Sequence, residues 1–194
     1  MFFWKSNPDL DTPDLQTCQG EVPICSAETA AKFNPPTASW TLFGGVVRPK
    51  SRGQIRLTGP NPQDPLQIEP NTLSHPDDLN AAKASVRLCR EIGNSLPLRS
   101  FVKREVAPGN LEGPALDNFI RDAAMSYAHQ ASTAKMGRDA MSVVDGQLKV
   151  YGIDNLRIAD ASIMPRVTTG NTMAPCVVIG ERVAEILKEA HGMS

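Results

Sequence analysis

Three segments of the chain carry apolar residues at steps of three and four, and each predicts an amphipathic helix. The first spans residues 77–92, with Ser74 as its N-cap and Gly93 at its end. The second spans residues 114–127, and the third follows Cys176 toward the C-terminus. A helix of this kind buries its apolar face and turns the other toward water, so each needs another element to pack against.

Shorter apolar runs predict strands in the first part of the chain. Residues 40–48 and 54–58 are joined by PKSRG, whose Pro and Gly suit a turn, so the two runs predict an antiparallel hairpin. Two further strands are predicted at residues 66–70 and 101–107.

The remaining segments predict less regular structure. Residues 1–37 are rich in Pro and Asp and predict a loop, with one short strand near residues 22–25. Closer to the C-terminus, residues 145–147 (DGQ) predict a two-stranded feature, and residues 156–159 predict a short strand.

Together these elements predict an α+β fold. An antiparallel sheet built from the strands near residues 40–70 and 101–107 would be covered on one face by the helices at 77–92 and 114–127. A chain of 194 residues is long enough to bury a sizeable core of this kind.

Composition narrows the class of protein. A hydrophobic fraction of 41% and a net charge of -1 are typical of a soluble globular protein and give no basic excess for a nucleic acid partner. No apolar run approaches the roughly 20 residues of a membrane span, and no signal peptide is evident, so a cytoplasmic protein is expected. The four cysteines have no zinc-type spacing, so they predict reduced thiols and no metal site.

The segment SYAHQASTAKMG places His129, one of three histidines, just after the predicted second helix. An imidazole titrates near neutrality and can exchange a proton with an alcohol, so His129 is a candidate catalytic residue. The alternative is a structural histidine bonded to a backbone carbonyl. His75 and His191 are weaker candidates, because they lie in the first turn of a predicted helix and near the C-terminus.

A second polar feature, TTGNTMAP, lies just before the last predicted helix. The unpaired amides of a helix N-terminus suit an anion or an electron-rich ring edge. The alternative is that Asn171 or Thr172 only caps the helix. The motifs of metal-assisted hydrolysis, serine hydrolysis and phosphoryl transfer do not occur in the sequence.

Three ordered blocks, HQASTAKMG, LKVYGIDNLRIADASIMP and GNTMAP, resemble the C-terminal half of the glucose-methanol-choline (GMC) family of flavin-dependent oxidoreductases. The upstream stretches NPDLDTPDLQ, GGVVRPKSRGQIRL and DPLQIEPNTLSHPDDL are similar to the substrate domain of that family. The resemblance therefore covers nearly the whole chain.

The resemblance implies oxidation of an alcohol, sugar or choline-like CH–OH group to a carbonyl, with hydride delivered to N5 of FAD. It assigns His129 as the catalytic histidine and Asn171 as its partner, a position that is Asn or His in different members. Residues matching flavin contacts are Asp160, Ala161, Thr172 and Met173. The family often has Gly at the position of Ser132 and Asn at that of Met173.

The chain lacks the G-x-G-x-x-G turn that binds a dinucleotide pyrophosphate, so the N-terminal FAD domain of the family is expected to be absent. Residues 1–139 would form the substrate-binding domain, including the histidine loop. Residues 140–194 would close the flavin site and pack on the missing FAD domain. The partner would then be a separate FAD-binding chain. A targeting signal would be lost with the missing domain. The alternative to an enzyme is a non-catalytic fragment or binding remnant.

Overall fold

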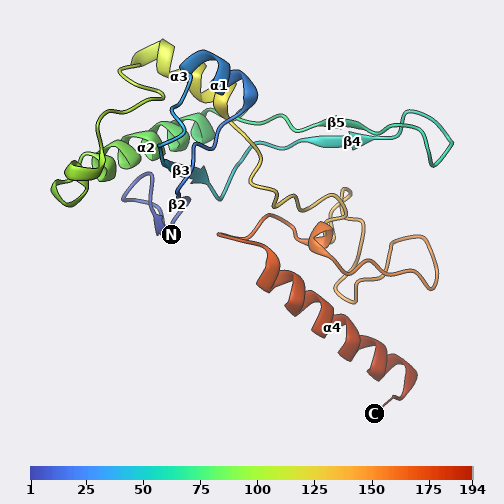
Figure 1. Cartoon of the computed structure of the whole chain (residues 1–194). Coiled ribbons are helices and arrows are strands. Elements are labelled where there is room, and N and C mark those ends of the chain that lie inside the picture. The colour runs from blue at the N-terminus through green and yellow to red at the C-terminus, as the bar shows by residue number, and fades with distance from the viewer. Residues whose placement is uncertain (194) are drawn as a thin grey trace. The chain divides into compact units, whose positions relative to one another are not determined.

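The computed structural model describes residues 1–193, and the chain divides into two compact units, Met1–Tyr127 and Ala128–Ser194. The first unit contains all the named strands and three α-helices, and the second contains one long helix and a set of loops (Figure 1). Each unit has its own cluster of buried apolar side chains.

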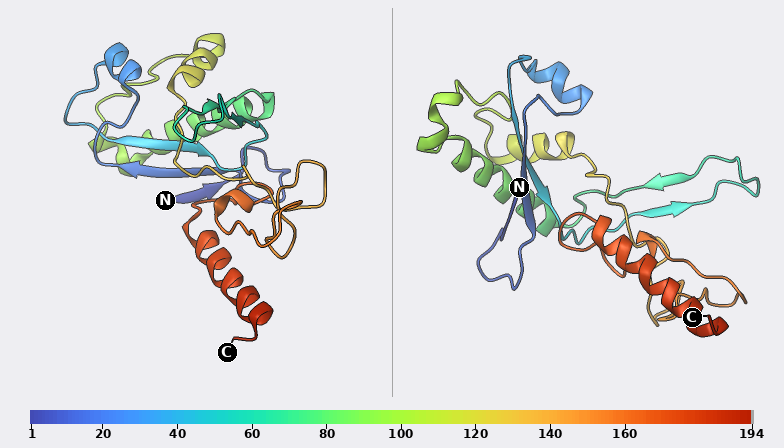
Figure 2. Two further views of the ribbon diagram at one scale, coloured as in Figure 1. Left: turned by 90° about the vertical axis from the view of Figure 1, so that its right-hand side faces the viewer. Right: turned by 60° about the horizontal axis from the view of Figure 1, so that its bottom comes forward.

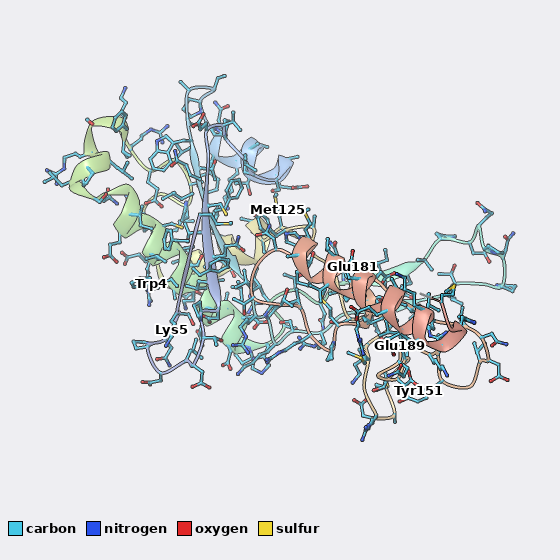
Figure 3. All side chains as sticks on the ribbon, turned by 90° about the horizontal axis from the view of Figure 1, so that it is seen from below. Trp4, Lys5, Met125, Tyr151, Glu181 and Glu189 are labelled. Atoms are coloured by element: carbon cyan, nitrogen blue, oxygen red, sulfur yellow. The ribbon has the colours of Figure 1, made fainter. Side chains whose placement is uncertain are left out.

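The sheet of the first unit is antiparallel and has three strands in the order β1-β2-β3 (Figure 2). These strands are β1 (Phe2–Trp4), β2 (Leu15–Gly20) and β3 (Thr41–Val46). In the central strand Leu15 is 1% exposed, whereas Trp4 on the edge strand, labelled in Figure 3, is 57% exposed. The buried part of the sheet is therefore its middle.

Helix α2 (Pro76–Gly93) packs against β2 and β3. The approach is closest at Gly44, where an added Cβ would lie 2.0 Å from Oγ of Ser85. Ser85 is 1% exposed, so it has little room to move aside. Burial also raises the pKa of the neighbouring Cys89 thiol, which keeps it protonated as a small apolar group.

Helix α3 (Gly113–Ala123) packs against α2, and α1 (Ala27–Phe33) packs against α3. The ring of Phe33 meets that of Phe119 edge-on, with centroids 5.5 Å apart. A short 3-10 helix, η1 (Leu96–Phe101), follows α2. The apolar cluster between α2 and α3 contains Leu73, Leu116 and Ile120, with Leu79, Ala82, Val86, Leu111 and Phe119 packed against it.

The carboxylate of Asp78 fixes the chain between β3 and β4 to the first turn of α2. It is 3% exposed, and it accepts hydrogen bonds from the backbone N–H of Lys50 (2.8 Å) and of Ser51 (2.7 Å). The hydroxyl of Ser51 also donates to it, at 2.5 Å. Three donors thus satisfy this buried carboxylate.

Beyond this anchor, β4 (Gln54–Arg56) pairs antiparallel with β5 (Gln67–Glu69) in a separate two-stranded sheet. The paired strands extend away from the helices of the first unit (Figure 1).

The second unit is built around α4 (Met173–His191) and the 3-10 turn η2 (Ala161–Ile163). Its loops are tied by isolated bridges that include Val144 to Val150 and Lys149 to Arg157. Glu181 and Glu189 lie on the exposed face of α4 (Figure 3). The buried core of the unit consists of Val144, Leu148, Ile163 and Ile186.

The α+β class and the predicted helices are confirmed, as are strands within residues 40–48, 54–58 and 66–70. The predicted hairpin between the first two runs is wrong, because β3 pairs with β2 and β4 pairs with β5. The PKSRG segment does not turn the chain back, since Asp78 holds its backbone against α2.

Three local predictions are also wrong. The segment 101–107 is not a strand, because η1 occupies its start and the rest is irregular. Residues 1–37 are more regular than predicted, since they contain β1, β2 and α1, while residues 22–25 form no strand. The N-cap of α2 is His75 rather than Ser74: its Nδ1 accepts from the N–H of Asp77 at 3.2 Å.

Near the C-terminus, residues 156–159 form only the isolated bridge at Arg157, while a bridged turn does surround Asp145–Gln147. Helix α3 ends at Ala123, four residues before the predicted end at Tyr127.

The two units separate at Tyr127 and Ala128, earlier than the predicted boundary after residue 139. The difference has a backbone cause. The N–H groups of Ser132, Ala134 and Met136 donate to the carbonyls of residues 161, 162 and 163, at 3.3, 3.0 and 2.7 Å. The histidine loop therefore belongs to the same unit as α4.

Gly44→Ala is expected to lower the free energy of unfolding by about 1–3 kcal/mol, because the new methyl group overlaps Ser85 in a packed interface. Gly45→Ala is the matched control, since its Cβ would lie 3.6 Å from the carbonyl of Gln16, an ordinary contact. Urea denaturation of both variants measures the difference. Equal stability of the two variants would contradict the close approach.

Asp78→Ala is expected to lower the free energy of unfolding by about 3 kcal/mol, because it leaves the N–H groups of Lys50 and Ser51 without their acceptor. Asp77→Ala, which removes an exposed carboxylate one residue earlier, should leave the unfolding midpoint near that of the wild type. If Asp78→Ala and Asp77→Ala unfold at the same denaturant concentration, the anchor has no energetic role.

Candidate active site

The ring of His129 is hydrogen-bonded through both of its nitrogens. Its Nδ1 lies 3.0 Å from Oγ1 of Thr172, and its Nε2 lies 2.9 Å from Nδ2 of Asn171. The structure thus brings His129 and Asn171 together, although 42 positions separate them in the sequence. All three residues belong to the second unit.

The loop that carries His129 has an uncommon backbone. Ala128 has a φ of 59° and Ser132 a φ of 76°, both in the left-handed region that disfavours residues with a Cβ. The hydrogen bonds from Ser132, Ala134 and Met136 to η2 hold the loop in this conformation. At Ser132 this φ also gives a backbone reason for the Gly that similar sequences often carry there.

Asn171 and Thr172 are placed by the start of α4. The preceding Gly170 has a φ of 105°, which a glycine adopts without a steric penalty, and it is buried. Thr172 is 8% exposed, and its carbonyl accepts from the N–H of Cys176 at 3.0 Å, within the first turn of the helix. Asn171 is exposed, and its amide nitrogen contacts the ring of His129.

The amide of Asn171 sets the chemistry at Nε2. An amide nitrogen only donates hydrogen bonds, so the 2.9 Å contact is a hydrogen bond when the proton of the neutral ring is on Nδ1. In this arrangement Nε2 carries a lone pair and can take a proton. A half-buried imidazole with a lone pair beside an exposed amide donor is suited to removing the proton of a hydroxyl group.

Asp160 and Ala161 have visible structural roles. Asp160 caps η2, where its Oδ1 accepts from the N–H of Ser162 at 2.7 Å, and the carbonyl of Ala161 accepts from Ser132. The Ser162 hydroxyl, followed by its backbone N–H, holds the pKa of Asp160 below its usual range. The carboxylate of Asp160 is therefore ionised at neutral pH.

The first turn of α4 has the donors and the apolar surface that a flavin ring requires. Met173 is 78% exposed, and one turn later Val177 and Val178 are 54% and 66% exposed. The helix begins without a side-chain cap, so its first amides stay available to an electron-rich ring edge. Thr172 and Met173 lie at the start of α4, where the resemblance expects flavin contacts, and Asp160 caps η2.

The sequence predictions missed one contact, the hydrogen bond between Oγ1 of Thr172 and Nδ1 of His129. Thr172 was assigned to the flavin side or to helix capping only. The sequence does carry a signal for the missed role: a proline at the third position of α4, Pro175, cannot donate to a capping side chain.

Within residues 1–193, no cluster of three or more His, Cys, Asp or Glu side chains is arranged to hold a metal ion. The described part of the chain also contains no helix with the length and hydropathy to cross a bilayer.

The comparisons with known proteins show the family of the chain. Residues 49–180 match the family model of the GMC oxidoreductase C-terminal region. The chain is 38% identical over 191 residues to the alcohol dehydrogenase (acceptor) of Pseudomonas putida, covering 95% of this chain and 33% of that protein. It is also 38% identical over 192 residues to the mitochondrial choline dehydrogenase of Mus musculus, covering 96% of this chain and 31% of that protein.

Among solved structures, pyridoxine 4-oxidase from Mesorbium loti superposes with a TM-score of 0.87 at 31% identity, over 94% of this chain and 36% of that one. The chain therefore spans about a third of the length of these relatives. Because the family model covers more than half of the chain and several relatives match nearly all of it, the chain belongs to the GMC oxidoreductase family.

Proposed function

We propose that this chain is the part of an FAD-dependent oxidoreductase that binds a CH–OH donor and removes its hydroxyl proton. His129 would act as the general base, and Asn171 would hold the substrate oxygen. The observation that carries the proposal is the 2.9 Å contact between Nδ2 of Asn171 and Nε2 of His129.

The names of the relatives support the class of substrate. They include an alcohol dehydrogenase, a choline dehydrogenase and a pyridoxine 4-oxidase. Alcohols, choline and pyridoxine all contain a carbon that bears a hydrogen and a hydroxyl group. We therefore propose a small alcohol of this kind as the substrate.

The two side chains match the needs of such an oxidation. A substrate hydroxyl placed beside them can accept from the amide of Asn171 and donate its proton to Nε2 of His129. The proton moves to His129 while the carbon loses a hydride, that is, its hydrogen with both electrons of the C–H bond, to become a carbonyl. FAD, when bound, would supply the acceptor for those two electrons and that hydrogen.

The residues proposed to hold FAD are Thr172 and Met173 at the start of α4, together with Asp160 and Ala161 at the start of η2. The partial positive charge at the N-terminus of α4 would favour an electron-rich ring edge there. The adenine end needs a dinucleotide site, and no G-x-G-x-x-G motif occurs in the 194 residues. We therefore propose an FAD-binding domain as the partner, either in the same polypeptide or as a separate chain.

The first test uses this chain joined to the N-terminal two-thirds of the Pseudomonas putida relative, purified with FAD. Anaerobic addition of a primary alcohol is expected to bleach the oxidised flavin absorbance. His129→Ala should slow that reduction by about 10²-fold or more, because it removes the proton acceptor. His191→Ala, at the far end of α4, serves as the histidine control and should reduce at the wild-type rate.

Flavin that is bound but reduced at the wild-type rate in His129→Ala would contradict the assignment of the base. A fusion that binds no flavin, with the same domain able to bind it in its own protein, would favour the alternative of a non-catalytic remnant.

Asn171→Ala is expected to slow flavin reduction by about 10²-fold, since it removes one donor to the substrate oxygen. Asn171→His should retain most of the rate, because an imidazole N–H can donate in the same place and the resemblance allows His at this position. Stopped-flow absorbance measures both rates. Equal loss in the two variants would mean that hydrogen-bond donation is not the function of this side chain.

A further inference from the structure

The hydroxyl of Thr172 does not cap the helix that it precedes. Thr172 is the N-cap of α4, and an N-cap side chain commonly accepts from the backbone N–H of the second or third helical residue. Thr172 makes no such bond. Its Oγ1 lies instead 3.0 Å from Nδ1 of His129.

The local sequence explains this use. The second and third residues of α4 are Ala174 and Pro175, and proline has no backbone N–H to donate. Thr172 also has a φ of -90° and a ψ of -4°, which is a helical conformation rather than the extended one of a typical N-cap. Both features direct the hydroxyl away from the helix.

The other side of the ring determines which atom donates. Because the amide nitrogen of Asn171 donates to Nε2, the single proton of a neutral imidazole must be on Nδ1. The Nδ1–H group then donates to Oγ1 of Thr172, at 3.0 Å. In the opposite tautomer, Nε2–H and the amide N–H of Asn171 would be two donors facing each other.

We propose that Thr172 is a positioning residue that holds His129 in the tautomer with the proton on Nδ1. Thr172 is only 8% exposed, so water competes little for its hydrogen bond with His129. Two consecutive residues therefore fix one ring in both orientation and protonation: Thr172 accepts from Nδ1, and Asn171 donates to Nε2. That the lone pair on Nε2 serves as a base rests on the proposed function, but the tautomer itself does not.

The test is a long-range proton–nitrogen correlation NMR spectrum of the 194-residue chain labelled with ¹⁵N-histidine, recorded where the ring is neutral. The chain has three histidines, and His129→Asn identifies the resonances of interest by their loss. In the wild type, Nε2 of His129 should resonate as an unprotonated nitrogen and Nδ1 as a protonated one. Thr172→Val, which keeps the shape and removes the hydroxyl, should move the resonances of both nitrogens part of the way toward averaged values, because Asn171 alone then favours the tautomer.

Thr172→Ser keeps the hydroxyl and should restore the wild-type pattern. Thr169→Val, at an exposed threonine of the same loop, should leave the pattern unchanged. A circular dichroism spectrum of each variant checks that α4 is intact.

Two results would overturn the inference: a protonated Nε2 in the wild type, or a folded Thr172→Val with the wild-type nitrogen shifts. Both outcomes are independent of flavin, so they are distinguishable from a failure of His129→Ala to slow substrate oxidation.

Discussion

Two hydrogen bonds to one imidazole ring are the interaction on which the candidate site depends. His129 lies between a hydroxyl and an amide that are supplied by neighbouring residues, Thr172 and Asn171. Because the two partners are consecutive, any movement of the start of α4 shifts both contacts together. The ring can therefore be held in one orientation only if that helix start and the histidine loop are each fixed.

The second unit fixes them in two ways. The loop after His129 is bonded through its backbone to η2, which Asp160 caps. Helix α4 is anchored farther along by Ile186, which is 4% exposed in the cluster with Val144 and Ile163. The helix is thus held through its apolar face, whereas its first residue, Met173, is exposed.

Features that depend on nearby residues were predictable from the sequence. The apolar stripes predicted α2, α3 and α4, and short apolar runs predicted β3, β4 and β5, since the signals for these elements lie within each segment. The pairing of β3 with β2 was not predictable, because it depends on contacts from residues that the Pro-rich composition had assigned to a loop. Likewise, the anchor at Asp78 acts across 28 positions and reverses the expected hairpin.

The candidate site shows the same division. The pairing of His129 with Asn171 came from a family resemblance, and the structure brings the two side chains together. The hydrogen bond between Thr172 and His129 depends on the helical backbone at Thr172 and on the missing N–H of Pro175. These two features are informative only once the start of α4 is known. Side-chain hydrogen bonds between distant segments are the part that composition and periodicity do not encode.

The central claim is that Nε2 of His129 is the proton acceptor of the site, and neutron diffraction from crystals of the chain at neutral pH tests it most directly. That measurement locates the exchanged hydrogens themselves. The account predicts deuterium on Nδ1, facing Oγ1 of Thr172, with Nε2 bare beside the amide of Asn171. Deuterium on Nε2 with Nδ1 bare would contradict it.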